Sequence, residues 1–167
     1  GSGLVTPALA RDLASRVRRR GVPVLVDSRY ALTKYHGLTA CDPNESEVEQ
    51  ALGVRIDDHL RVLERAGRRL LDRTKMAAVI VTRGSRGMAV FEPGKKTVHI
   101  PIFGSDQIAD VTGAGDTVMA TLTLALAAGA SVEHAARLAN VAGGLVVMKR
   151  GTATVAAAEL TRALRSA

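Results

Sequence analysis

The chain has 167 residues, enough for one domain with a real hydrophobic core, and its single cysteine, Cys41, excludes an intrachain disulfide. Apolar residues make up 47% but aromatic residues only 2%, so the core must be built from Ala, Val and Leu, and the apolar stretch 118–130 is too short to span a membrane. The net charge is +7, but the arginines are spread over helical patterns without interleaved aromatic side chains, which favours a solvated surface over nucleic-acid binding.

The first half of the chain alternates helical patterns with short apolar runs. A helix is predicted to begin at Thr6-Pro7, where the hydroxyl can cap the helix and proline suits its first position, and to end at Gly21. The predicted elements that follow are a strand at 23–27, a strand at 37–41, a helix beginning at Asn44 and a helix over 57–72. Strands separated by helices are typical of parallel βαβ units.

The second half begins with AAVIVT at 77–82, which has the strongest strand pattern in the chain. Two apolar runs on either side of Pro93-Gly94 predict a hairpin. Helices are predicted over 114–128, 131–149 and 156–165, with Gly129 and Gly151 at element ends. These patterns predict one α/β domain over residues 1–167, with a largely parallel sheet flanked by helices.

The segment ADVTGAGDTVMA, residues 109–120, places small residues at the start of a helix. A helix N-terminus presents unpaired N–H groups and the positive end of the macrodipole, so the Gly113–Gly115 amides are a candidate anion site. Asp116 in the first turn is stabilised as a carboxylate and could take a proton from a hydroxyl that attacks a bound phosphoryl group. Ordinary loop-to-helix junctions share these residues, so a purely structural interpretation stays open. The chain has no Walker motif, and Val118 replaces the third glycine of a dinucleotide fingerprint.

Several motifs resemble those of the ribokinase-like (PfkB) carbohydrate kinases. DVTGAGDTVMA resembles the C-terminal signature of that family, except at Thr121, where the pattern prefers Gly or Ala. Further matches, in the expected order, are NESE (44–47), VTRGSRG (81–87), LAN (138–140) and KRGTATV (149–155). The resemblance implies a ribokinase-like fold of which this chain holds only the C-terminal, nucleotide-binding part. It also implies ATP-dependent phosphorylation of a sugar hydroxyl.

The resemblance implies a role for each matched residue. Asp116 would be the catalytic base, and the amides of Gly113, Ala114 and Gly115 would form the anion hole. Asn44 and Glu47 would act around Mg²⁺ and the ATP phosphates, Glu47 through water, because Mg²⁺ gives up its water reluctantly. The same pair has the spacing of a capping box, and both interpretations can hold together.

The remaining matches concern the nucleotide and a monovalent cation. The residues implied to border the nucleotide are Thr82, Gly84, Gly87 and Asn140, although the first three also suit a hairpin turn and Asn140 a polar helix position. Asp110 and Thr112 match positions where several family members bind a monovalent cation such as K⁺. Asp110 could instead only orient the loop.

Within the family, DVTGAGDTV, CDPNESE and KRGTATV most resemble the kinases of D-glycero-β-D-manno-heptose 7-phosphate, which act on the anomeric hydroxyl and in many bacteria are fused to a nucleotidyltransferase. Another sugar or nucleoside kinase, or a nucleotide-binding module without turnover, stays an alternative. We expect a sugar or sugar-phosphate substrate, a cytoplasmic location, and no nucleic-acid or membrane partner.

Members of the family are considerably longer than this chain. We therefore expect it to lack most of the sugar pocket and the lid, and to be a poor kinase by itself, since lid closure completes such sites. We also expect an unpaired sheet edge, which could support a homodimer.

Overall fold

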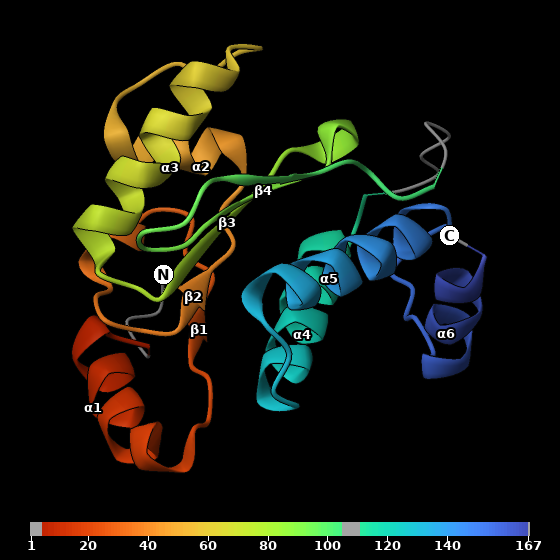
Figure 1. Cartoon of the computed structure of the whole chain (residues 1–167), viewed down its shortest axis with the longest axis horizontal. Coiled ribbons are helices and arrows are strands. Elements are labelled where there is room, and N and C mark those ends of the chain that lie inside the picture. The colour runs from red at the N-terminus through yellow and green to blue at the C-terminus, as the bar shows by residue number, and fades with distance from the viewer. Residues whose placement is uncertain (1–4, 105–110, 167) are drawn as a thin grey trace. The chain divides into compact units, whose positions relative to one another are not determined.

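The computed structural model describes residues 5–104 and 111–166 (Figure 1). Its α-helices are α1 (Pro7–Val17), α2 (Glu45–Leu52), α3 (Leu60–Thr74), α4 (Ala114–Ala127), α5 (Val132–Val147) and α6 (Ala157–Arg165). Its strands are β1 (Leu25–Val26), β2 (Ala40–Cys41), β3 (Ala78–Thr82), β4 (Met88–Phe91) and β5 (Val98–Ile100). Short 3₁₀ turns cover Arg18–Arg20, Leu32–Lys34 and Gly84–Arg86. Across these described ranges, no helix has both the length and the apolar character needed to cross a bilayer.

The chain divides into two compact units. Unit 1 comprises residues 1–83 and 89–98, and unit 2 comprises residues 84–88 and 99–167. Unit 1 contains helices α1 to α3 and most of the sheet, whereas unit 2 contains α4 to α6. The single domain predicted from the sequence therefore stays a prediction.

The strands follow the order β1-β2-β3-β4-β5 in one sheet. The pairs β1–β2 and β2–β3 are parallel, with Leu25 opposite Ala40 and Ala40 opposite Ala78. The segments 83–87 and 92–97, which join β3 to β4 and β4 to β5, are too short for a parallel crossover, so these pairs are antiparallel. The predicted α/β class and the strands of the parallel part are confirmed, and β4 and β5 form the predicted hairpin.

Most helix boundaries also follow the sequence prediction, with one clear exception. Thr6 caps α1 by accepting a hydrogen bond from the amide of Leu9 at 3.2 Å. The helix predicted over 57–72 instead begins at Leu60, because the backbone of Asp57 is left-handed, with φ +45°. It ends two residues later than predicted, at Thr74, where Lys75 is left-handed as well. Neither Asp nor Lys signals such a conformation as glycine does.

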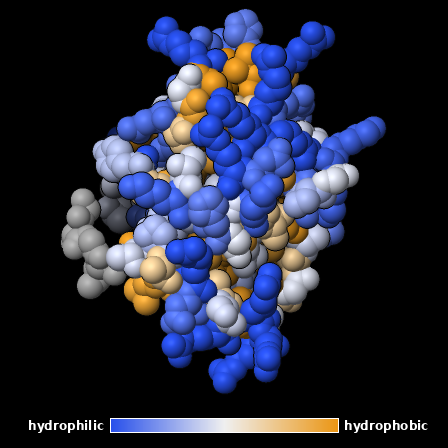
Figure 2. All heavy atoms as spheres, turned by 90° about the vertical axis from the view of Figure 1, so that its left-hand side faces the viewer, coloured by the Kyte–Doolittle hydropathy of each residue, from blue (hydrophilic) through white to orange (hydrophobic). Residues whose placement is uncertain are grey.

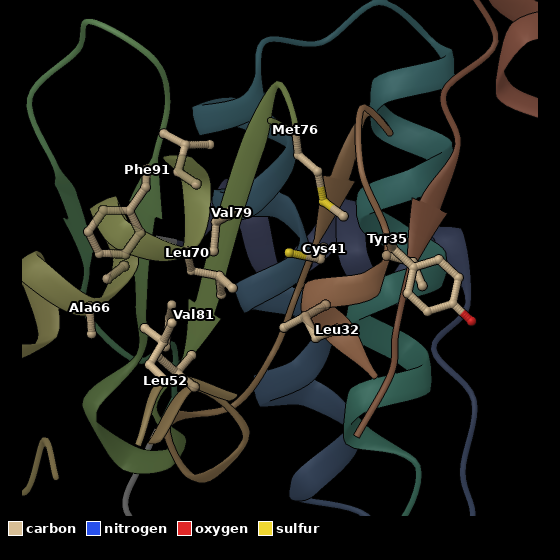
Figure 3. Packing of buried hydrophobic residues seen from close by; sticks show 14 of the residues in the cluster. Leu32, Tyr35, Cys41, Leu52, Ala66, Leu70, Met76, Val79, Val81 and Phe91 are labelled. Atoms are coloured by element: carbon tan, nitrogen blue, oxygen red, sulfur yellow. The ribbon is translucent and has the colours of Figure 1, made fainter. Parts of the chain in front are cut away.

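The core of unit 1 lies between the sheet and helices α2 and α3. Figure 3 shows Leu70 of α3 beside Val79, and Phe91 beside Ala66. The predicted Ala, Val and Leu side chains dominate this core, but Phe91 is the largest fully buried side chain. A chain with so few aromatic residues thus buries one of them completely in this core.

Gly67 of α3 packs directly against the ring of Phe91. A methyl group at Gly67 would overlap the ring, so this helical glycine is required by space and not by its backbone angles. Next to it, the guanidinium of Arg68 lies 5.5 Å from the centre of the same ring. Arg68 also donates hydrogen bonds to the carbonyl oxygens of Glu92 (2.7 Å) and Lys95. One turn of α3 thereby holds the β4–β5 hairpin.

Unit 2 is built on close contact between α4 and α5. A methyl group at Gly143 would lie 2.9 Å from Val118 Cγ2, and one at Gly144 would overlap the carbonyl of Phe103. The buried face of α5 is otherwise mostly alanine, including Ala135, Ala139 and Ala142. Small side chains therefore set the distance between these helices.

We predict that Gly67→Ala destabilises the protein by about 1–2 kcal/mol, because overpacking of the Phe91 ring outweighs the gain of about 1 kcal/mol in helix propensity. The measurement is the free energy of unfolding in urea. Phe91→Leu makes space for the methyl group. It should therefore lower the free energy of unfolding by less in the Gly67→Ala background than in the parent chain. An increase in stability on Gly67→Ala alone would contradict the packing argument.

Candidate functional site

The predicted anion turn lies at the N-terminus of α4, in unit 2. Gly113 is the N-cap residue with φ +78°, a left-handed backbone that suits glycine, and no side chain caps the helix. Within residues 5–104 and 111–166, no side-chain cap therefore satisfies the first-turn amides. Of the predicted anion-hole amides, that of Ala114 donates to the carbonyl oxygen of Val111 at 3.2 Å. The amide of Gly115 lies in the exposed first turn of the helix.

Asp116 follows this turn and is exposed. With Gly113 and Thr117 it lines a cavity of about 650 Å³, whose opposite wall is the loop Thr152–Val155. No ion pair within the described ranges holds Asp116. The carboxylate therefore faces an open space beside the start of a helix, as proton transfer to it requires.

The same cavity also has apolar lining. It includes Leu124 and Ala128 of α4, Leu138 of α5 and Leu160 of α6. Leu124 is 71% exposed, so this apolar surface is open to solvent. The lining thus combines polar groups, at the turn and Asp116, with apolar side chains of α4, α5 and α6.

The loop opposite Asp116 is held by Lys149. Its ammonium donates to the carbonyl oxygen of Thr154 at 2.7 Å and lies 2.8 Å from a carboxylate oxygen of Glu159. The other oxygen of Glu159 accepts from the amide of Ala156 at 2.8 Å. The hydrogen bond from Lys149, followed by that from Ala156, lowers the pKa of Glu159. Lys149 and Glu159 thus fix the loop to the start of α6.

Other predicted nucleotide residues of unit 2 lie in a turn and on α5. Gly84 and Gly87 have φ +55° and +78°, and the amide of Gly87 donates to the carbonyl of Gly84 at 3.1 Å. A side chain at Gly87 would overlap the carbonyl of Ile100, so glycine is required there. Asn140 is 8% exposed, and its side-chain amide donates to the carbonyl of Pro101 at 2.8 Å. These contacts explain the residue types structurally, and nucleotide contacts stay a prediction.

The predicted monovalent cation site is described only in part. Thr112 is exposed beside Gly113, whereas Asp110 lies outside the described residues. The site therefore stays a prediction.

In unit 1, the structure brings Asn44, Glu47 and Thr82 together where β2 and β3 end. Asn44 Oδ1 accepts from the amide of Glu47 at 2.9 Å, and Glu47 Oε2 accepts from the amide of Asn44 at 2.9 Å. This is the predicted capping box of α2. Asn44 also pairs in parallel with Thr82, whose amide donates to the carbonyl of Pro43 at 2.9 Å. A magnesium or phosphate role for the pair is compatible with this geometry and stays a prediction.

Sequence reasoning missed a charged pair beside these residues. Arg83 Nε donates to a carboxylate oxygen of Glu45 at 2.7 Å, and the two side chains are only 8% and 13% exposed. The pair ties the end of β3 to the first turn of α2. Its members are far apart in the sequence and belong to no helical spacing pattern, so no local signal indicated it.

Two further acids stand at the same edge of the sheet and were also missed. Asp27 directly follows β1, and Asp42 directly follows β2, after the register pair Val26 and Cys41. Burial, and then the charges of Asp42 and Asp27, raise the pKa of the Cys41 thiol. Ligands bind at the carboxyl ends of parallel strands, so an acid directly after each predicted buried strand was the sequence pattern that indicated these two residues.

The donors at this edge suit a hydrated magnesium ion. Carboxylate and amide oxygens are the ligands that Mg²⁺ prefers, and Mg²⁺ usually keeps several waters. The described residues contain no group of three His, Cys, Asp or Glu side chains able to hold a metal ion. Asn44 Oδ1 and Glu47 Oε2 also already accept backbone N–H groups. The residues present therefore fit an ion held through water and phosphate better than one held in a cage of side chains.

Comparison with solved structures gives the fold class. The chain resembles a ribokinase from Arabidopsis thaliana, determined in complex with ribose and ATP, with a TM-score of 0.83 and 26% identity over 96% of this chain and 53% of that one. It resembles phosphofructokinase-2 from Escherichia coli, in complex with potassium, with a TM-score of 0.81 and 21% identity, over 97% and 53% of the two chains. The fold is therefore ribokinase-like, and the chain spans about half of these neighbours.

Sequence comparison gives the family. Residues 3–159 match the model of the pfkB family of carbohydrate kinases, and the chain belongs to this family. It is 46% identical to the bifunctional protein HldE of Geobacter sulfurreducens, over 97% of this chain and 33% of that protein. It is 42% identical to HldE of Caulobacter vibrioides, over 99% of this chain and 34% of that protein. The chain thus spans about a third of these curated relatives.

We predict that Lys149→Met loosens the loop opposite Asp116. The substitution removes the donor to Thr154 and the cation beside Glu159, so amide hydrogen exchange over 150–156 should accelerate by up to about tenfold. In the parent chain, the ionised Glu159 should protect the amides of this loop from exchange at any pH above the ordinary pKa of a glutamate. This protection should be lost as the pH falls through the lowered pKa of Glu159.

The matched control is Arg137→Met, which removes an ion pair with Glu133 on the exposed side of α5. It should leave exchange over 150–156 unchanged. Equal acceleration in both variants would show that Lys149 does not hold the loop.

Proposed function

We propose that this chain supplies the ATP-binding part and the catalytic base of a sugar kinase. The observation that carries the proposal is the exposed Asp116 carboxylate, which lies in the first turn of α4 and lines a cavity together with Gly113. Membership of the pfkB family supports it. The active protein would comprise this chain together with the sugar pocket that longer relatives carry.

The chemistry follows from the positions of the turn and the acid. The amides of Gly113, Ala114 and Gly115 would bind the oxygens of the transferred phosphoryl group, for which the Ala114 amide would exchange its Val111 partner. Asp116 would take the proton from the sugar hydroxyl as that oxygen forms its bond to the γ-phosphorus of ATP. The bond from phosphorus to the bridging oxygen then breaks, and ADP leaves with the electron pair.

Ions and the nucleotide complete the proposed site. Mg²⁺ would neutralise charge on the ATP phosphates, with Asn44 and Glu47 contributing through water. Thr82, Gly84, Gly87 and Asn140 would border the nucleotide. Asp110 and Thr112 would hold a monovalent cation such as K⁺. Lys149 and Glu159 would keep the 150–155 loop in place opposite Asp116.

Heptose 7-phosphate is the substrate that we propose, with heptose 1,7-bisphosphate as the product. The support is the identity of 41–46% to relatives named HldE, together with the motifs at residues 41–47 and 149–155. Another sugar or nucleoside of the same family is the second candidate. We place the reaction in the cytoplasm, and propose that the edge strands of the sheet, β1 and β5, allow a homodimer.

A nucleotide-binding module without turnover is the other candidate function. The observation that favours it is that the amide of Ala114 already donates to the carbonyl oxygen of Val111, as in an ordinary structural turn. Binding of Mg-ATP without phosphate transfer to heptose 7-phosphate, ribose, fructose or adenosine, in a protein of the relatives' length, would select this candidate.

We predict that Asp116→Asn lowers kcat by a factor of about 10²–10⁴, because the amide cannot accept the proton. Affinity for Mg-ATP should stay nearly the same, since Asp116 is assigned to the sugar hydroxyl. The measurements are steady-state transfer and nucleotide binding, in a protein of the relatives' length that carries this sequence. Asp12→Asn, at an exposed ion pair on α1, is the matched control and should keep full turnover. If Asp116→Asn kept most of its turnover, Asp116 would not be the catalytic base.

A further inference from the structure

A row of arginines runs along the outer side of α3, in unit 1. Arg61, Arg65, Arg69 and Arg73 recur every four residues, and all four are exposed. They lie along a concavity of about 950 Å³, which five guanidinium groups and two carboxylates line. The concavity therefore carries an excess of positive charge. Figure 2, which views the side of unit 1 that bears α1 and α3, shows a surface covered mostly by hydrophilic side chains.

The fold gives no reason for this row. Of the arginines on α3, Arg68 holds the β4–β5 hairpin, whereas the four in the row point outward from the core side of the helix. Like charges four residues apart destabilise a helix. Elsewhere the chain avoids that cost by pairing Arg16 with Asp12 on α1 and Arg137 with Glu133 on α5. On α3, Arg61 and Arg69 have an acid three residues later, Glu64 and Asp72, whereas Arg65 and Arg73 have none at three- or four-residue spacing.

We propose that this row, Arg61–Arg65–Arg69–Arg73, binds an acidic α-helix of a protein partner. Residues four apart on a helix are separated by about 6 Å along the axis, so the row spans about 18 Å. A helix with Glu or Asp at every fourth position presents carboxylates at the same interval. When two helices pack by these four-residue ridges, the ridges run parallel and interdigitate, at a crossing angle of about −50°.

The residue type supports a carboxylate ligand. Arginine presents a planar fork of N–H donors that binds a carboxylate through two hydrogen bonds, which the point charge of lysine cannot do. A nucleic acid fits less well. Phosphates in a duplex rise about 3.4 Å per residue on each strand and wind away from a straight row, and α3 has no aromatic side chain on which a base could stack.

The experiment measures binding of labelled probes to this chain by fluorescence anisotropy, at about 20 mM salt, where exposed charges are little screened. The first probe is a helical peptide of about 18 residues with Glu at every fourth position. The second has the same composition, with its glutamates distributed around the helix. The third is a DNA duplex of similar length. The ridge peptide should bind at least about tenfold more tightly than the redistributed peptide, and also more tightly than the duplex.

Two charge-reversal variants locate the site. Arg65→Glu with Arg69→Glu should weaken binding of the ridge peptide by about tenfold or more. Arg18→Glu with Arg19→Glu, the same change of charge at exposed positions outside α3, should keep most of the affinity. Circular dichroism spectra of both variants are compared with that of the parent chain to test that they are folded.

Four results would overturn the proposal. They are no binding of the ridge peptide at low salt, equal binding of the redistributed peptide, tighter binding of the duplex, and equal loss of affinity in the two variants. Tighter binding of the duplex would assign the row to nucleic acid instead.

Discussion

The start of α4 is the constraint on which the proposed chemistry depends. A helix that begins on a left-handed glycine without a side-chain cap leaves first-turn amides to be satisfied by something else. Here the Ala114 amide turns back to the carbonyl of Val111, a weak substitute at 3.2 Å that an anion could replace. Beside a bound anion, the Asp116 carboxylate would be repelled, and the proposed proton transfer from the sugar hydroxyl would give it a role there. In the proposed reaction, the same turn accounts for both the glycines and the acid.

The capping box of α2 is compatible with the functional role proposed for the same two residues. Asn44 and Glu47 each use one side-chain oxygen for the cap. A carboxylate has a second oxygen, and an ion that keeps its water shell needs only that oxygen at some distance. The cap fixes the orientation of both side chains, and the Arg83–Glu45 pair fastens the same turn to β3. These contacts would hold the two side chains in place for the proposed water-mediated binding of Mg²⁺.

The fold could be predicted from the sequence wherever the signal was local. Thr6 capped its helix, the hairpin formed around Gly94, and the strand predicted at 77–82 contains β3, because each depends on neighbouring residues alone. What escaped prediction depends on contacts between distant segments. Arg83 and Glu45 form an ion pair although they are 38 positions apart in the sequence. Gly67 is unfavourable for a helix by its residue type, and only its contact with the Phe91 ring explains it. At the site, Asp116 and the capping box came from motifs, whereas Asp27 and Asp42 share an edge only through strand register.

Charge is distributed over this small chain in two distinct ways. On α1 and α5, basic and acidic side chains pair along the helix, and such exposed pairs add little beyond solubility. On α3, four exposed arginines follow one another at the same spacing without an acid in the row. The pairs on α1 and α5 add no net charge, so the excess of +7 resides in other residues. The exposed run Arg18–Arg20 and the row on α3 are two arginine clusters that contribute to it, and of these only the row on α3 repeats at helical spacing.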